Sequence, residues 1–177
     1  MEIPSDGVRL NVGSGRHSLD GWVNVDLANN PAAVRPPDII APAWAIPLPD
    51  ASVKELMAIH LFEHFYHWEC SKVLNEWKRL MRKGATLVLE MPDLFKFCKN
   101  VIEGRTTGRQ PDDLGLWGMY GDPREQDPLM CHRWGWTFST LAPFLLKHGF
   151  KDCVEAPTEW HHVGKNVRDF RITAKRI

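Results

Sequence analysis

Two glycines and a carboxylate near the start of the chain have the residue types and spacing of a nucleoside-binding site. Gly13, Ser14 and Gly15 follow the alternating run Val8 to Val12, and Asp26 ends a second short β-like run. Glycines lack a Cβ, so backbone N–H groups can approach a ligand closely. An acid at the carboxyl end of a strand can accept hydrogen bonds from ribose hydroxyls. These residues predict a ligand site at the carboxyl edge of a sheet.

The spacing of the glycines argues against two phosphate-containing ligands. A dinucleotide fingerprint has a third Gly or Ala and an acid about 20 residues further on, whereas Ser18 holds the third position and Asp26 comes eleven residues after Gly15. The chain also lacks the G-x-x-x-x-G-K-[ST] run of a phosphate-binding loop. The pattern therefore favours a nucleoside without phosphates.

A second string with chemical potential runs from His60 through Glu63 to His64. It matches H-x-x-E-H, the inverted zincin signature, which requires a helix carrying both histidines and a third ligand further on. The β-like run Leu56 to Ile59 ends directly at His60. This order favours a loop and a helix start after a strand, where Glu63 either caps backbone N–H groups or lines a cleft with His64.

Two later residues are candidates for work on an acceptor, and each has a structural alternative. Asp93 follows the strand Thr86 to Met91 and can orient an acceptor or cap the next helix. His132 lies in the long aromatic-rich segment 104–136, which is the expected place for substrate selection. Its structural alternative is to order its own loop.

The sequence predicts no metal site. Cys131 and His132 could be combined with His161 and His162, but their spacing fits no standard ligand pattern. The cysteines are scattered without a C-x-x-C pair, which is typical of reduced thiols in a cytosolic protein.

The elements that must position these residues alternate between strand-like and helix-like patterns. Helices are expected over Trp68 to Met81 and Phe138 to His148 because apolar residues recur there at spacings of three and four. The remaining strands are expected at 38–40, 150–154 and 169–175, the last with one face in water, and a turn at 82–85. The order of elements indicates an α/β fold.

Length, charge and hydropathy limit the number of domains, the class of partner and the location that can be expected for the protein. The 177 residues suit one domain, residues 1–177, with a real core. The 22 basic and 22 acidic residues give no electrostatic signal for nucleic acid as a partner. No apolar run reaches the ~18 residues of a membrane span, and the start lacks a signal-peptide pattern, so a cytoplasmic protein is expected. The oligomeric state cannot be read from these features.

Three runs together resemble the class I S-adenosylmethionine (SAM) dependent methyltransferases: LNVGSG…GWVNVD, PLPDASVKELMAIHLFEHF and LNEWKRLMRKGATLVLEMPD. More narrowly, the chain is similar to a small bacterial and phage branch, methyltransferase type 11-like, in which the first helix is abbreviated. The resemblance implies a three-layer Rossmann-like fold. Its mostly parallel seven-stranded sheet ends in an antiparallel hairpin.

The resemblance also implies SAM as cofactor and assigns residues to it. Gly13, Ser14 and Gly15 would meet the amino-acid end of SAM, Asp26 its ribose, and His60 would form the wall near the methyl group. Relatives commonly carry a carboxylate for the adenine where this chain has Pro42. Adenine would then meet the backbone of Ala43 or stack on Trp44, and core packing is the equal alternative for Trp44.

The function expected from these features is methyl transfer to an unidentified acceptor. A small molecule is favoured, and sugar-like acceptors are suggested by the resemblance alone. His132, His60 and Asp93 are the candidate catalytic residues, and the resemblance implies that His132 is a general base. Two alternatives stay open: a SAM-binding module without catalysis, and a zinc hydrolase built on His60, Glu63 and His64.

Overall fold

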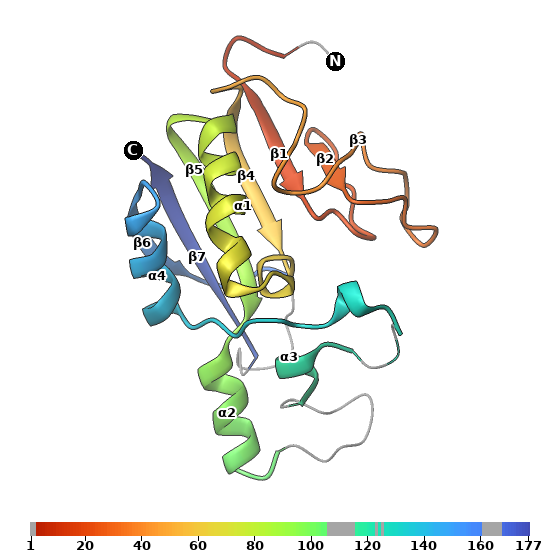
Figure 1. Ribbon diagram of the computed structural model, residues 1–177, viewed down its shortest axis with the longest axis vertical. Coiled ribbons are helices and arrows are strands. Elements are labelled where there is room, and N and C mark those ends of the chain that lie inside the picture. Colours follow the sequence, from red (N-terminus) through yellow and green to blue (C-terminus); the bar gives the residue numbers. More distant parts are fainter. Residues whose placement is uncertain (1–2, 106–115, 123, 125, 161–167) are drawn as a thin grey trace.

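A seven-stranded sheet forms the centre of the computed structural model, which describes residues 3–105, 116–122, 124, 126–160 and 168–177 (Figure 1). The strand order is β3-β2-β1-β4-β5-β7-β6. The strands are β1 Val8–Val12, β2 Val23–Asp26, β3 Ile39–Ile40, β4 Val53–Ile59, β5 Met81–Pro92, β6 Phe150–Ala156 and β7 Asp169–Arg176.

Six strands run in one direction and β7 runs against them. Parallel pairing joins β3 to β2, β2 to β1, β1 to β4 and β4 to β5. The antiparallel strand β7 pairs with β5 on one side and β6 on the other. The predicted mostly parallel seven-stranded sheet with a terminal antiparallel hairpin is confirmed.

The main helices are α1 His67–Leu80 and α4 Phe138–Lys147, close to the bounds that the apolar spacing predicts. The shorter elements are η1 Phe62–His64, α2 Leu94–Ile102, α3 Leu116–Tyr120 and η2 Pro128–Met130. Gly149, at a φ of +89°, follows the last turn of α4 and lets the chain turn into β6. No helix among the described residues has the length and apolar character that crossing a bilayer requires.

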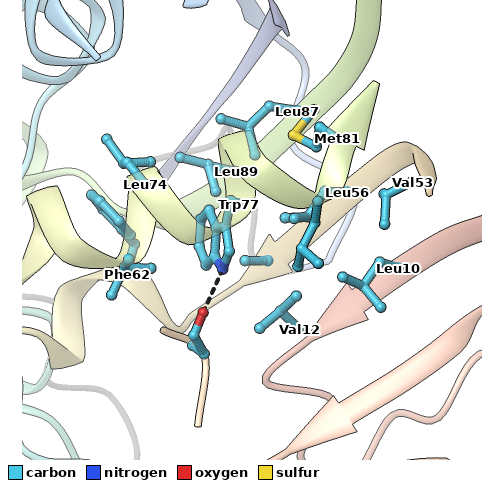
Figure 2. Close-up of a cluster of buried hydrophobic side chains, with 14 of the residues drawn as sticks. Leu10, Val12, Val53, Leu56, Phe62, Leu74, Trp77, Met81, Leu87 and Leu89 are labelled. Carbon is cyan, nitrogen blue, oxygen red and sulfur yellow. Dashed lines mark hydrogen bonds between the residues drawn. The ribbon is translucent and has the colours of Figure 1, made fainter. Parts of the chain in front are cut away.

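The hydrophobic core lies between the sheet and helices α1 and α4. Trp77 of α1 is fully buried against side chains such as Leu10 and Leu56 of the sheet (Figure 2). Its indole Nε1–H donates to the carbonyl of Ala43 at 3.0 Å, so the one polar atom of this side chain is satisfied inside the core. Leu141 and Leu145 of α4 extend the same core.

The helices that carry the core, α1 and α4, lie on one face of the sheet (Figure 1). The links from β1 to β2 and from β2 to β3 contain no helix, so the first helix is lost rather than abbreviated. A residue range as short as 13–22 cannot cross over and also form a helix of normal length. These two links therefore contribute no helix to the layers around the sheet.

Two local expectations differ from the structure. The predicted turn at 82–85 is a bulge within the longer strand β5, where the pairing shifts between Met81 and Thr86 and Gly84 takes a φ of +78°. Strand β7 does not have a wet face over its first half: Asp169 to Ile172 are all buried. The reason is its position between β5 and β6, where Arg171 pairs with the buried Glu90.

Candidate active site and cofactor site

The carboxyl ends of β1, β2, β4 and β5 meet at one edge of the sheet. The sequence-predicted residue Asp26 ends β2, and Gly13, His60 and Asp93 directly follow the other three strands. Parallel strands place their carboxyl ends side by side, and this edge is where open α/β sheets bind ligands. The beginning of the antiparallel strand β7 adds Asp169 to the same edge, opposite Pro92.

The glycine turn is held by β2. The backbone N–H groups of Gly13 and Ser14 donate to the carbonyl of Val25 at 2.8 and 3.1 Å. The N–H of Gly15 donates to Oδ2 of Asp26 at 2.6 Å. Gly13 and Gly15 have φ values of +72° and +53°, a region that favours glycine. The turn and the carboxylate thus form one unit.

A cavity of about 230 Å³ opens beside this unit. His17 and Trp160 both line it, and their rings meet edge to face with centroids 5.4 Å apart. Ser14 lines it with a buried hydroxyl that has no hydrogen-bond partner among the described residues. Its lining consists of Asn11, Gly13, Ser14, Gly15, Arg16, His17, Ile59, His60 and Trp160.

His60 forms one wall of the cavity and bridges two buried acids. Its Nδ1 lies 3.1 Å from Oε1 of Glu63, and its Nε2 lies 3.5 Å from Oδ2 of Asp169. Burial opposes protonation of the ring, but hydrogen bonds to Asp169 and Glu63 outweigh it and raise the pKa of His60 to about 9. At neutral pH His60 is therefore a cation between carboxylates and not a proton acceptor.

Glu63 connects η1 to the distant segment that carries His132. Its backbone carbonyl accepts hydrogen bonds from the N–H groups of Arg133 at 2.8 Å and Trp134 at 3.2 Å. The side chain is 2% exposed. Burial opposes its ionisation, yet the hydrogen bond to His60 dominates and lowers the pKa of Glu63 to about 2.

His132 lies next to this group but outside the lining of the cavity. Its Nδ1 lies 2.9 Å from the carbonyl of Gly118, and its ring meets that of His64 edge to face at 4.9 Å. Burial lowers the pKa of His132, so the neutral ring predominates at neutral pH. Because a carbonyl can only accept, Nδ1 carries the proton and Nε2 keeps a lone pair.

Asp93 caps helix α2. Its Oδ1 accepts a hydrogen bond from the N–H of Phe95 at 3.0 Å, which is the structural role that the sequence allowed. Burial raises the pKa of Asp93, and Lys96 lies 3.8 Å from Oδ2 and opposes that rise. The carboxyl group is at the sheet edge, but the cavity lining does not include it.

Ala43 and Trp44, predicted to meet adenine, also lie outside the lining of the cavity. The carbonyl of Ala43 accepts from Trp77. The Trp44 ring packs edge to face on Phe65 at 6.1 Å and lies under the ammonium of Lys72. These are the contacts of the core-packing alternative, on the side of α1.

The residues His60, Glu63 and His64 do not lie on the helix that a zinc hydrolase site of this kind requires. His60 has a φ of +50°, outside any helix, and η1 covers only Phe62–His64. Both ring nitrogens of His60 face carboxylates. His60 and His64 therefore do not present ligands one helical turn apart. His161 and His162 lie outside the described residues.

Buried polar groups around the cavity were missed by the sequence analysis. Glu90 is fully buried and accepts from the N–H groups of Glu159 and Trp160 and from Nη1 of Arg171. This anchors the segment that brings Trp160 to the cavity. An acid inside the apolar run of β5 and an arginine in β7 were the available signal, because a charge at a buried strand position needs a partner.

Comparison with known proteins agrees with this architecture at the level of fold. No protein-family model matches the sequence, and no curated protein matches it. A SAM-dependent methyltransferase from Archaeoglobus fulgidus has a similar structure, with a TM-score of 0.64 and 17% identity over 98% of this chain and 88% of that one. One from Methanosarcina mazei has a TM-score of 0.64 and 15% identity over 99% and 95%.

A third similar structure was solved with ligands. The 1,6-didemethyltoxoflavin-N1-methyltransferase of Burkholderia thailandensis, with bound 1,6-didemethyltoxoflavin and S-adenosylhomocysteine, has a TM-score of 0.58 and 15% identity over 96% of this chain and 70% of that one. The chain therefore has the Rossmann-like fold of class I SAM-dependent methyltransferases.

Proposed function

We propose that the protein is a SAM-dependent methyltransferase whose acceptor is an unidentified small molecule, with sugar-like compounds included. The observation that carries the proposal is the unit formed by the glycine turn and Asp26, beside a cavity at the carboxyl edge of this fold. The narrower assignment to the bacterial and phage type 11-like branch rests on the three sequence runs described above.

The residues around the cavity fit the cofactor chemically. Asp26 retains acceptor capacity for ribose hydroxyls, because in the described part of the chain one of its oxygens accepts a hydrogen bond from Gly15 and the other accepts one from Leu27. The buried Ser14 hydroxyl gains a partner when a polar ligand enters. The His60 imidazolium can attract the carboxylate of the methionine part.

The cavity must widen for a ligand of this size. Its volume of about 230 Å³ is below the roughly 300–1,000 Å³ of small-molecule sites. The ring contact between His17 and Trp160 closes one side. We infer that this contact opens when the cofactor binds, while the Glu90 anchor holds Glu159 and the backbone of Trp160 in place.

SAM supplies an activated methyl group when bound, so the residues of the chain mainly align the acceptor with it. Where the acceptor must lose a proton, the neutral His132 is the better candidate base, since its Nε2 keeps a lone pair. His60 is assigned to the cavity wall and Asp93 to positioning of α2 near the acceptor. Recognition of adenine by Ala43 and Trp44 stays a prediction.

The proposal is tested with methyl-labelled SAM. Equilibrium dialysis is expected to give saturable binding of one SAM per chain, and transfer of label to an acceptor in a small-molecule panel would identify the substrate. Saturable binding without transfer to any acceptor would favour the non-catalytic SAM-binding module. Absence of saturable binding would contradict both.

A further inference from the structure

Three metal-binding side chains converge beside the cavity although they come from two distant parts of the sequence. Glu63 and His64 belong to η1, and His132 lies in the segment between η2 and α4. One ligand atom from each of the three lies within 4.8 Å of the other two. Ligand atoms around a four-coordinate zinc ion at ~2.0–2.2 Å are roughly 3.5 Å apart, so small side-chain rotations would close this set on an ion.

Both histidines make an outer hydrogen bond of the kind that metal-bound histidines make. The Nδ1 of His132 lies 2.9 Å from the carbonyl of Gly118, and the Nδ1 of His64 lies 3.2 Å from the carbonyl of Cys131. A carbonyl cannot donate, so each Nδ1 carries the ring proton and each Nε2 presents a lone pair. Metal-bound histidines almost always make this kind of outer hydrogen bond, which fixes the tautomer and the ring direction.

The carboxylate supplies an independent observation. Glu63 is 2% exposed, and while Oε1 contacts His60, Oε2 is buried without a hydrogen-bond partner in the described part of the chain. Buried polar atoms are normally paired. A cation held between Oε2 and the two imidazoles would give this oxygen its missing partner.

The backbone holds the two segments together before any ion is present. The carbonyl of Glu63 accepts from the N–H groups of Arg133 and Trp134, and the N–H of His132 donates to the carbonyl of Tyr120 at 3.2 Å. The ligand positions are therefore fixed by main-chain contacts on both sides, as a preformed site requires.

We propose that Glu63, His64 and His132 bind a first-row divalent cation of the zinc type. Two imidazoles and one carboxylate form a common three-ligand set for Zn²⁺ and for related ions such as Co²⁺ and Fe²⁺. The set differs from the H-x-x-E-H pattern, because His132 is a ligand and His60 is not. His60 instead contacts the ligand Glu63. The site shares His132 with the proposed methyl transfer, because an ion bound to its Nε2 would take the lone pair assigned to the base, whereas SAM binding at the glycine turn does not depend on the ion.

The test uses Co²⁺ and Zn²⁺ as probes on the full chain without an affinity tag, after removal of metal with a chelator. The parent is expected to bind one Co²⁺ per chain, seen in its visible absorption, and Zn²⁺ should displace it and raise the melting temperature. His132→Gln and His64→Gln should each weaken binding by roughly 100-fold or more, since even outer-shell changes cost 10–100-fold.

Two control variants separate this site from other metal-binding groups. His67→Gln removes an exposed histidine near η1, and Cys131→Ser removes the exposed thiol next to His132. Both should bind Co²⁺ as the parent does. Glu63→Gln is the third ligand variant, beside His132→Gln and His64→Gln. Circular dichroism shows which of these ligand variants keep the parent fold.

The proposal is overturned by any of three results. These are a parent that binds no stoichiometric Co²⁺ and gains no thermal stability from Zn²⁺, folded ligand variants that bind as the parent does, and loss of binding in Cys131→Ser. The readouts involve no SAM, so failure of the metal site and failure of the methyltransferase proposal can be told apart.

Discussion

Asp26 at the end of β2 accepts a hydrogen bond from the backbone N–H of Gly15 at 2.6 Å. This contact joins the turn after β1 to the carboxylate after β2, and the two N–H groups before it bond to Val25 in the same strand. The glycine backbone lines the cavity, whereas Asp26 lies outside its lining and is joined to it through the hydrogen bond to Gly15.

Gly13→Ala should destabilise the protein more than Gly84→Ala. Both positions have a similar positive φ, +72° and +78°, so the backbone strain is matched at about 1–2 kcal/mol. A Cβ on Gly13 would lie 2.9 Å from the Leu61 side chain, whereas one on Gly84 would meet nothing within 4 Å. Denaturant unfolding of both variants measures the difference.

The contact with Leu61 should account for the additional loss of unfolding free energy in Gly13→Ala. Leu61→Ala in the Gly13→Ala background should recover part of the loss, because it removes the two Cδ contacts at 2.9 Å and leaves only the Cβ contact at 3.1 Å. Equal unfolding free energies for Gly13→Ala and Gly84→Ala would show that the contact with Leu61 contributes nothing.

Glu90→Gln should lower the unfolding free energy by up to about 3 kcal/mol, because it leaves the buried Arg171 guanidinium paired only with the exposed Glu159. Replacing both residues by Met should cost less than the single change, since no unpaired charge remains. Glu55→Gln on the neighbouring strand β4 serves as control, with an expected change within about 0.5 kcal/mol. Chemical denaturation measures all three, and a double variant less stable than Glu90→Gln would contradict this account.

The unfolding free energy should depend on the ionisation of Glu76. Hydrogen bonds from Arg79 lower the pKa of Glu76 below its ordinary value of 4.5, against the opposing effect of burial. A group whose pKa is lower in the folded state stabilises the fold above its unfolded pKa, and this contribution disappears as the pH falls through the folded pKa.

Glu76→Gln should therefore cost about 1 kcal/mol at pH 7, a modest value because Arg79 is partly exposed. The difference from the parent should shrink as the pH drops below 4.5. Urea denaturation at several pH values measures this, with Glu55→Gln as the control. A difference that stays constant down to pH 3 would exclude Glu76 as the titrating group.

Much of the fold could be predicted from the sequence because its signals are local. The alternation of Val8, Leu10 and Val12 marks β1, and the three- and four-residue spacing around Trp77 marks α1 almost to the residue. The two faces of β7 could not be inferred from alternation, because Arg171 is buried by its partner Glu90 from another strand. A pairing over this sequence distance leaves no local periodicity.

In the candidate site, too, groups formed by residues close in sequence could be predicted and groups formed by distant residues could not. The glycine turn and Asp26 are close in sequence, and the structure brings them together. The cluster of Glu63, His64 and His132 depends on a chain segment that returns to η1 after nearly 70 residues, so its spacing matches no ligand pattern. Trp44 packs on the core although adenine stacking was equally compatible with the sequence.

The most direct test of the central claim is a calorimetric titration of the parent, Asp26→Ala and Asp20→Ala with S-adenosylhomocysteine. Asp20 is the matched control, since its side chain is exposed in the loop between β1 and β2. The account predicts saturable binding of one ligand by the parent and Asp20→Ala, and affinity at least roughly tenfold weaker in folded Asp26→Ala because a charged hydrogen-bond acceptor is lost. Equal affinity in all three proteins, or no binding by the parent, would contradict it.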